Sequence, residues 1–494
     1  MNAFFVPPLF SNITNYLKKA YTLDVRALSL MRIGIGMILL VDLIIRSLSI
    51  KAFFTDEGIL PTAVLKDHNW NPYYFSFHSM DGSLWWQILL FAVNGLCIAL
   101  LIMGYRTRLF TFICWAFLVS LQNRNPFILQ GGDELLKLML LWGIFLPWGE
   151  RYSIQRSSLK LNHFFSLANV GYMLLIGSVY FFSALYKTSP EWHSEGTAIY
   201  YALSLDQMRM PLGSLLYNYP SLMIGLTPIV YYIELFAPLL ILLPLLFPKI
   251  RFAGIILIML LHIGIATTLY VGLFYIIGIV SLIGVLPAFA MDWFDAKFLK
   301  RTMPSVTIDN DIESQNPSKF NFMYDILFSL KNGLIIFIIG YCLLLNLSKL
   351  NKFPYTLSDT IGKVGAMLRL EQSWGMFSPS VLKADGFFVY GGFTNQKKLL
   401  DVKHNKDSLS FAKPDNGVSE FESDRWRKFG ENYLSNYNNY MRPYYCRYLL
   451  RKWNKEHPDK SIIELTIFYM KELSLPNYQT KPLEKLVLCS CQNN

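Results

Sequence analysis

The chain has 494 residues, of which 53% are hydrophobic, 16% aromatic and only 16% charged. With a mean hydropathy of +0.33, this composition excludes an ordinary water-soluble protein. The net charge of +11 is not arranged as a basic stripe interleaved with aromatic residues, so nucleic acid is not an expected partner. Apolar runs recur through the first 350 residues and predict a polytopic membrane protein in a lipid bilayer.

A bilayer crossing needs about 20 apolar residues, and we predict about nine transmembrane helices by this criterion. They are 28–48, 85–103, 106–122, 134–148, 165–186, 221–247, 252–270, 272–292 and 329–348. The chain then divides into an all-α transmembrane core at 1–294 with spans one to eight, a polar connector at 295–328, the ninth span at 329–348 and an extramembrane domain at 349–494.

Basic residues gather in the loops on one side of this predicted bundle. With an odd number of spans, the loops on one side of the membrane carry Lys18, Arg26, Arg106, Arg151, Lys249, Lys297 and Lys300. Loops rich in lysine and arginine face the cytoplasm. The N-terminus is therefore expected inside and the C-terminal domain outside, in an inner membrane of the bacterial type, with residues 295–328 forming a cytoplasmic connector.

The C-terminal region has the composition of a small soluble α+β domain. Gly386–Gly392 and Leu399–Val402 predict a hairpin, residues 421–455 predict helices, and Ile462–Tyr469 alternates like a strand. Disulfides persist outside the cytoplasm, so Cys446 could bridge to either Cys489 or Cys491. No histidine has the spacing of a zinc ligand, and we predict no metal site.

Ionisable side chains at bilayer depth are costly and are candidates for function. Asp42 and Arg46 are spaced i, i+4 on the first span, so they share one helix face and predict a structural ion pair. Glu234 and His262 lie mid-span on consecutive antiparallel helices at similar depth. We expect them to form a hydrogen-bonded pair, which either contacts substrate or only fills the bundle.

An apolar helix ends in Tyr180–Lys187, followed by Trp192 and Gly196. This order places a lone amine beside aromatic rings at the mouth of the bundle. The pKa of a lysine amine changes readily on desolvation, so Lys187 can serve as a base near neutral pH or equally as an interface anchor. Three polar residues of the turn-forming stretch 122–133 are expected to share an outer vestibule with Lys187, unless that stretch is only a connector: Asn123, Arg124 and Asp133.

Taken together, these segments resemble the HTTM (horizontally transferred transmembrane domain) family, which includes vitamin K-dependent gamma-glutamyl carboxylase. The resemblance runs from about Asp24 to Asp385. It rests on Asp24–Arg26, Arg32, Asp42, Phe53–Pro61, Asn123–Asn125, Gly131–Asp133, Phe145–Pro147, Tyr180–Gly196, Glu234–Pro238, His262 and Gln372–Pro379. The order and spacing of the motifs carry the resemblance, rather than any single one.

The resemblance implies that Lys187 deprotonates a reduced quinone similar to vitamin K hydroquinone. The quinol would then react with oxygen, and the resulting alkoxide would remove a glutamate γ-proton of a protein or peptide acceptor so that carbon dioxide can add. The chain departs from the carboxylase in two respects. It has Pro147, Trp148 and Glu150 where the carboxylase has a supporting histidine, and its external domain is much shorter.

Two functional interpretations therefore stay open. In the first, the chain is a carboxylase- or epoxidase-like membrane enzyme that uses Lys187 as a base on a reduced quinone. In the second, it is a non-catalytic binding or scaffold protein whose pocket holds a lipid or a partner helix. A transporter is disfavoured, because the sequence has no inverted pair of broken helices.

Overall fold

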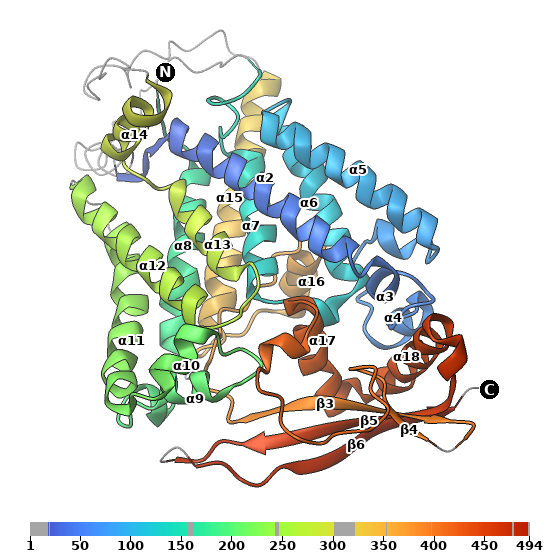
Figure 1. Ribbon diagram of the computed structural model, residues 1–494. Coiled ribbons are helices and arrows are strands. Elements are labelled where there is room, and N and C mark those ends of the chain that lie inside the picture. The colour runs from blue at the N-terminus through green and yellow to red at the C-terminus, as the bar shows by residue number, and fades with distance from the viewer. Residues whose placement is uncertain are drawn as a thin grey trace, which may run out of the picture.

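The computed structural model describes residues 18, 20–155, 162–242, 247–300, 322–351, 353–396, 398–476 and 479–492. Within these ranges the chain is mostly helical, with a four-stranded antiparallel sheet in the C-terminal region. Long helices form a bundle, and the sheet lies across one end of it (Figure 1). The predicted combination of a helical membrane core and a small α+β region is thus confirmed in outline.

The bundle is built from apolar helices with identifiable ends. Ser83 caps one of them by accepting a hydrogen bond from the backbone of Trp86, and Gly104 ends the same helix in the left-handed conformation that glycine adopts without strain. The bundle helices are α2 (Val25–Ser47), α5 (Leu84–Met103), α6 (Thr107–Arg124), α7 (Gly131–Phe145), α8 (Leu167–Tyr186), α11 (Pro220–Leu242), α12 (Pro248–Thr268), α13 (Phe274–Ile283), α14 (Ala288–Phe294) and α15 (Phe322–Leu347).

Six described helices are long and apolar enough to cross a membrane, and a seventh span results if α13 and the segment from Ala288 to Leu299 are taken together across their 101° bend. This finding corrects the expected nine. The apolar runs 106–122 and 134–148 correspond to α6 and α7, which pack against each other. Helix α7 has only 15 residues, and its segment from Leu135 to Gly143 is buried by protein.

Short helices occupy the ends of the bundle. Helices α3, α4, α9 and α10 lie at the end nearest the sheet (Figure 1). The short elements are β1 (Leu23–Asp24), β2 (His163–Phe164), α3 (Ile50–Phe54), α4 (Thr62–His68), η1 (Phe77–Ser79), η2 (Pro126–Ile128), η3 (Pro190–Trp192), α9 (Ala198–Ser204), α10 (Pro211–Tyr217), the π-helical turn η4 (Asp295–Leu299) and α16 (Asp359–Met367). Most of the predicted connector at 295–328 lies outside the described residues; α15 begins at Phe322.

The C-terminal sheet has the strand order β4-β3-β5-β6. Its strands are β3 (Ala384–Thr394), β4 (Leu399–Asp401), β5 (Ile462–Leu473) and β6 (Glu484–Gln492), and its helices are η5 (Val418–Glu420), α17 (Asp424–Leu434), η6 (Asn436–Met441), α18 (Arg442–Glu456) and η7 (Pro458–Lys460). The predicted hairpin is confirmed by the antiparallel pairing of β3 with β4. The predicted strand lies within β5, and the predicted helical stretch contains α17 and α18.

Cysteines of this region form one covalent link. Cys446 of α18 is joined to Cys491 of β6 by a disulfide that spans 45 residues of sequence. Cys489 is a free thiol. Because β6 is an edge strand of the sheet, the bridge ties this edge to the helix that packs on it.

Candidate functional site

Lys187 follows directly after α8, and its side chain is only 2% exposed. Its Nζ donates a hydrogen bond to Ser183 Oγ at 2.9 Å and forms an ion pair with the carboxylate of Glu234. Ser183 precedes Lys187 by four residues, so the two side chains lie on the same face of the chain. Ser183 Oγ also donates to Glu234 at 3.2 Å. The amine that looked isolated in the sequence therefore belongs to a buried three-residue cluster.

Trp192 closes this cluster from the loop side. The Lys187 Nζ lies 4.7 Å from the centroid of the Trp192 ring, which is within the range of a cation–π interaction. Trp192 Nε1 donates a hydrogen bond to the backbone oxygen of Phe377 at 3.0 Å. His193 in turn hydrogen-bonds the backbone oxygen of Lys187 through its ring at 2.7 Å. The segment Gln372–Pro379, one of the motifs found in the sequence, thus positions the aromatic face that covers the amine.

The expected pairing of Glu234 with His262 is not what the described residues show. Glu234 of α11 pairs with Lys187, whereas His262 Nε2 of α12 shares a hydrogen bond of 2.7 Å with the Tyr180 hydroxyl. Tyr180 lies in α8 and Lys187 directly follows that helix, seven residues or about two helical turns away, so both side chains lie on one face. Tyr180 contacts His262, and Lys187 contacts Glu234. The similar depth of Glu234 and His262 in the sequence could not reveal that each side chain finds its partner on or next to α8.

His262 is packed tightly rather than exposed to a cavity. Its ring meets the Tyr180 ring edge-on, with centroids 5.6 Å apart, and its Nδ1 has no hydrogen-bond partner among the described residues. The position of Gly278 on α13 allows this packing, because a Cβ there would collide with the imidazole ring. This arrangement is typical of a structural histidine.

The three other vestibule candidates lie in different surroundings. Asn123 Nδ2 donates to the backbone oxygen of Phe75 at 2.6 Å, and its side-chain oxygen accepts from Arg369. Arg124 Nη1 donates to the backbone oxygen of Leu60 at 2.8 Å. Both side chains therefore hold loops to the end of the bundle. Neither they nor Asp133 contact Lys187 among the described residues, so the structure does not bring the expected vestibule together.

Asp133 belongs to a separate buried ion network. Asp42 and Arg46 of α2 form an ion pair at 2.7 Å, and Arg46 also pairs with Asp133 of α7 at 2.5 Å. Arg425 of α17 completes the network through Asp133 and through Asp42, whose Oδ1 lies 2.7 Å from Arg425 Nη2. Burial acts to lower the pKa of Arg425, but the carboxylates of Asp133 and Asp42 outweigh it and raise that pKa above its ordinary value.

Sequence reasoning missed Arg425. It lies in Ser423–Lys428, which looks like the exposed start of an ordinary amphipathic helix, and its partners are hundreds of residues away in the chain. The one available signal was an imbalance of charge: the two carboxylates of Asp42 and Asp133 face a single arginine, Arg46, which indicates that a second cation is needed.

An apolar groove of about 370 Å³ runs along α11 on the same helix that carries Glu234. It is lined by Pro228, Ile229, Tyr232, Ile233, Phe236, Ala237 and Leu240 of α11 and by Leu257 of α12. These side chains suit a hydrocarbon tail and offer no charge. Within the described residues, no group of three or more His, Cys, Asp or Glu side chains could hold a metal ion.

Comparisons with protein-family models, with curated proteins and with solved structures each returned no match to this chain. The class of this protein is therefore inferred from its own structure. Six of the described helices, or seven with the bent pair, can cross a bilayer, and the C-terminal region folds as an antiparallel sheet with packed helices. The chain is an integral, multi-pass membrane protein.

Proposed function

We propose that this chain is a membrane enzyme of the HTTM family that carries out acid–base chemistry on a reduced quinone, with Lys187 as the base. One observation carries the proposal: the Lys187 amine is buried, yet it contacts a hydroxyl, a carboxylate and an aromatic face at the end of an apolar helix. Three of the four residues of this cluster, Ser183, Lys187 and Trp192, lie in Tyr180–Gly196, one of the motifs that contribute to the family resemblance.

The cluster has a means of producing a free amine. A lysine paired with a carboxylate carries a proton and cannot accept another one. Transfer of that proton from Lys187 Nζ to Glu234 across their ion pair leaves a neutral amine and a neutral carboxyl group. Ser183, which hydrogen-bonds both partners, keeps them aligned.

The groove on α11 fits the tail of a quinone. Its lining is entirely apolar apart from the hydroxyl of Tyr232, and it lies on the helix that also carries Glu234. A bound reduced quinone would supply an ionisable hydroxyl group and the electrons for reaction with oxygen. Lys187 would accept the proton of that hydroxyl, and Glu234 and Ser183 would hold the amine in place. The acceptor of the later carboxylation would be a protein or peptide.

The orientation belongs to the same proposal. The turn between α5 and α6, the end of α7, the start of α12 and the end of α14 lie at the end of the bundle away from the sheet (Figure 1). Arg106, Arg151, Lys249 and Lys300 belong to or closely follow these segments. The positive-inside rule makes that end cytoplasmic, so the C-terminal region and Lys187 would face the outside of an inner membrane.

The test measures consumption of reduced menaquinone by the full-length protein in lipid nanodiscs. The wild type is expected to oxidise the quinol faster than empty nanodiscs, and Lys187→Ala is expected to lose about 100-fold or more of that rate, as removal of a general base does. Lys51→Ala, which removes an exposed lysine paired with Glu57, is the matched control and should keep the full rate. Absence of quinol oxidation in the wild type would overturn the proposal.

A second function, retention of a lipid or partner helix without catalysis, is favoured by the groove alone. Its residues Ile229, Tyr232 and Phe236 are each more than half exposed, so an apolar ligand would cover them. Mass spectrometry of lipids that copurify with the wild type and with Phe236→Ser distinguishes the two functions. Loss of a specific lipid in the variant, together with no quinol oxidation in the wild type, would support the binding function.

A further inference from the structure

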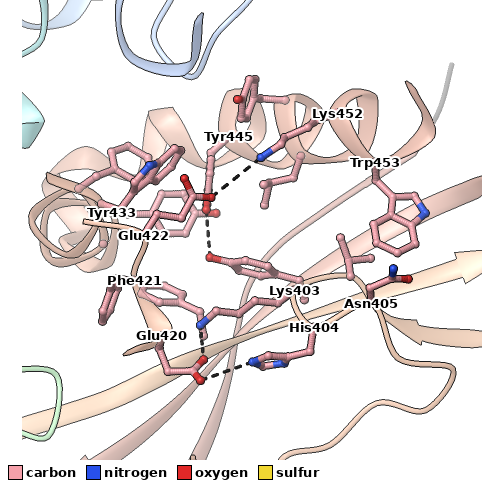
Figure 2. Close-up of a pocket in the computed structure, with 18 of the residues that line it drawn as sticks. Lys403, His404, Asn405, Glu420, Phe421, Glu422, Tyr433, Tyr445, Lys452 and Trp453 are labelled. Atoms are coloured by element: carbon pink, nitrogen blue, oxygen red, sulfur yellow. Dashed lines mark hydrogen bonds and ion pairs between the residues drawn. The ribbon is translucent and has the colours of Figure 1, made fainter. Parts of the chain in front are cut away.

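The C-terminal region holds a pocket that the proposed membrane chemistry does not use. It lies between β3, α17, α18 and the segments that follow β4 and contain η5, and its volume is about 610 Å³ (Figure 2). This size is within the range of small-molecule sites. Nine aromatic side chains line it, together with three glutamates and two lysines. The three glutamates and two lysines leave an excess of one negative charge, which favours a cation over an anion.

One half of the pocket already holds an ammonium group of the chain itself. Lys403 Nζ lies 2.5 Å from Glu420 Oε2, and it stands 5.9 Å and 5.8 Å from the ring centroids of Tyr390 and Phe421. The dashed contacts in Figure 2 show Glu420 joined to both Lys403 and His404. Two ring faces and a carboxylate are the groups that favour an organic cation in a partly dry site.

The other half offers similar groups, with two carboxylates to one lysine. Glu422 and Glu456 are exposed at the rim. The Lys452 ammonium is 4.0 Å from Glu422, and Glu456 forms no ion pair among the described residues. Trp453 and Tyr448 provide buried aromatic surface beside these carboxylates. This half could therefore hold a second cation from outside the chain.

A buried hydroxyl adds a directional requirement. Tyr433 is completely buried and lines the pocket, yet its hydroxyl oxygen has no hydrogen-bond partner in the described part of the chain. Buried polar groups are rarely left unpaired, so a ligand atom is the expected partner. A ligand with N–H groups could donate to this oxygen, whereas a quaternary ammonium could not.

We propose that this pocket binds a small organic cation that carries N–H donors, either a primary ammonium or a guanidinium group. The aromatic faces and the rim carboxylates hold the charge, and the Tyr433 hydroxyl accepts one N–H. A free amine and the basic side chain of a peptide share this chemistry. The site is independent of Lys187 and of any quinone.

The test uses calorimetric titration of the full-length protein in nanodiscs with agmatine. N-acetyl-arginine methylamide serves as the peptide-like probe, tetramethylammonium as the cation without N–H groups, and glucose as the neutral polar probe. Agmatine is expected to bind saturably, and the double variant Glu422→Gln, Glu456→Gln is expected to weaken it about tenfold or more. Glu484→Gln on β6, which removes an exposed carboxylate outside the pocket, is the matched control and should leave binding unchanged.

A second variant separates charge from hydrogen bonding. Tyr433→Phe removes only the unpaired hydroxyl, so agmatine should weaken about fivefold while any binding of tetramethylammonium stays the same. Binding of the peptide-like probe as well as agmatine would assign the site to basic side chains, and binding of agmatine alone would assign it to free amines. The proposal is overturned if no cation binds saturably, if glucose binds as tightly as agmatine, or if the rim variant binds agmatine unchanged.

Discussion

Arg425 Nη2 lies 2.7 Å from Asp42 Oδ1, and this contact joins α17 of the C-terminal region to α2, the first helix of the membrane bundle. The same guanidinium pairs with Asp133, so two buried carboxylates of the bundle depend on a cation supplied by the C-terminal region. A buried carboxylate without a partner is strongly unfavourable. The network therefore fixes where the C-terminal region sits on the bundle.

Replacing Arg425 tests whether the ion network fixes the position of the C-terminal region on the bundle. Arg425→Met should lower the free energy of unfolding by about 3–5 kcal/mol, because it leaves Asp42 and Asp133 with Arg46 as their only arginine partner in the described part of the chain. Thermal unfolding in detergent measures the loss. Arg447→Met, at an exposed position of α18, is the control and should change stability by about 0.5 kcal/mol or less. Equal stability of the two variants would contradict the account of the network.

Asp385 makes the stability of the C-terminal region depend on pH. Its carboxylate accepts backbone hydrogen bonds from Asp206 and Gln207, but burial, together with the charge of Asp206, raises its pKa to about 6. Because the pKa in the folded state is above the ordinary 3.8, the stabilisation is complete below about pH 4 and is lost as the pH rises through 6. The difference amounts to about 3 kcal/mol.

Asp385→Asn removes this titration while keeping an oxygen that accepts the two backbone hydrogen bonds. Between pH 4 and pH 7 the unfolding free energy should fall less in the variant than in the wild type. The difference between the two decreases should be about 3 kcal/mol. Asp407→Asn, which changes an exposed aspartate paired with Lys460, should retain the wild-type slope. An Asp385→Asn protein with the wild-type slope would show that Asp385 is not the titrating group.

The disulfide gives a prediction with an internal control. Cys491→Ser should destabilise the C-terminal region by about 2–5 kcal/mol, because it releases the link between α18 and β6. Cys489→Ser, two residues away on the same strand, changes a free thiol and should have little effect. Protease susceptibility of the region with and without a reducing agent measures both. If Cys489→Ser were the more damaging change, the pairing described above would be wrong.

Two glycines of neighbouring helices should respond oppositely to a methyl group. A Cβ at Gly278 would collide with the His262 ring, so Gly278→Ala should destabilise the bundle by about 1–3 kcal/mol. Nothing lies within 4 Å of a Cβ at Gly264, so Gly264→Ala should be neutral or stabilising by up to about 1 kcal/mol. Thermal unfolding of the two variants in the same detergent compares them. Similar melting temperatures would contradict the tight packing of His262.

Local patterns in the sequence were more informative than long-range ones. The Asp42–Arg46 ion pair follows from helical spacing alone, whereas Arg425, which completes that four-residue network, lies 383 residues from Asp42 and could not be predicted. Lys187 and Glu234 were both recognisable as candidates, but their pairing depends on how α8 and α11 are rotated about their axes. Apolar composition indicates how deep a residue lies in the bilayer, but it does not indicate how a helix is rotated about its axis.

The number of spans shows the same limit. The run 134–148 is as apolar as a crossing helix, but α7 owes its composition to burial among other helices and is too short to count as a span. Hydropathy does not distinguish a side chain that faces lipid from one that faces protein. The strands and helices of the C-terminal region were easier to predict, because alternation and turn residues mark them locally.

The most direct test of the central claim is the quinol oxidation rate of Lys187→Arg in nanodiscs. Arginine preserves the positive charge opposite Glu234, but its guanidinium does not release a proton in proteins and cannot act as a base. We predict that this variant unfolds at a temperature close to that of the wild type and oxidises reduced menaquinone about 100-fold more slowly. A folded Lys187→Arg protein that oxidises the quinol at the wild-type rate would contradict the assignment of Lys187 as the base.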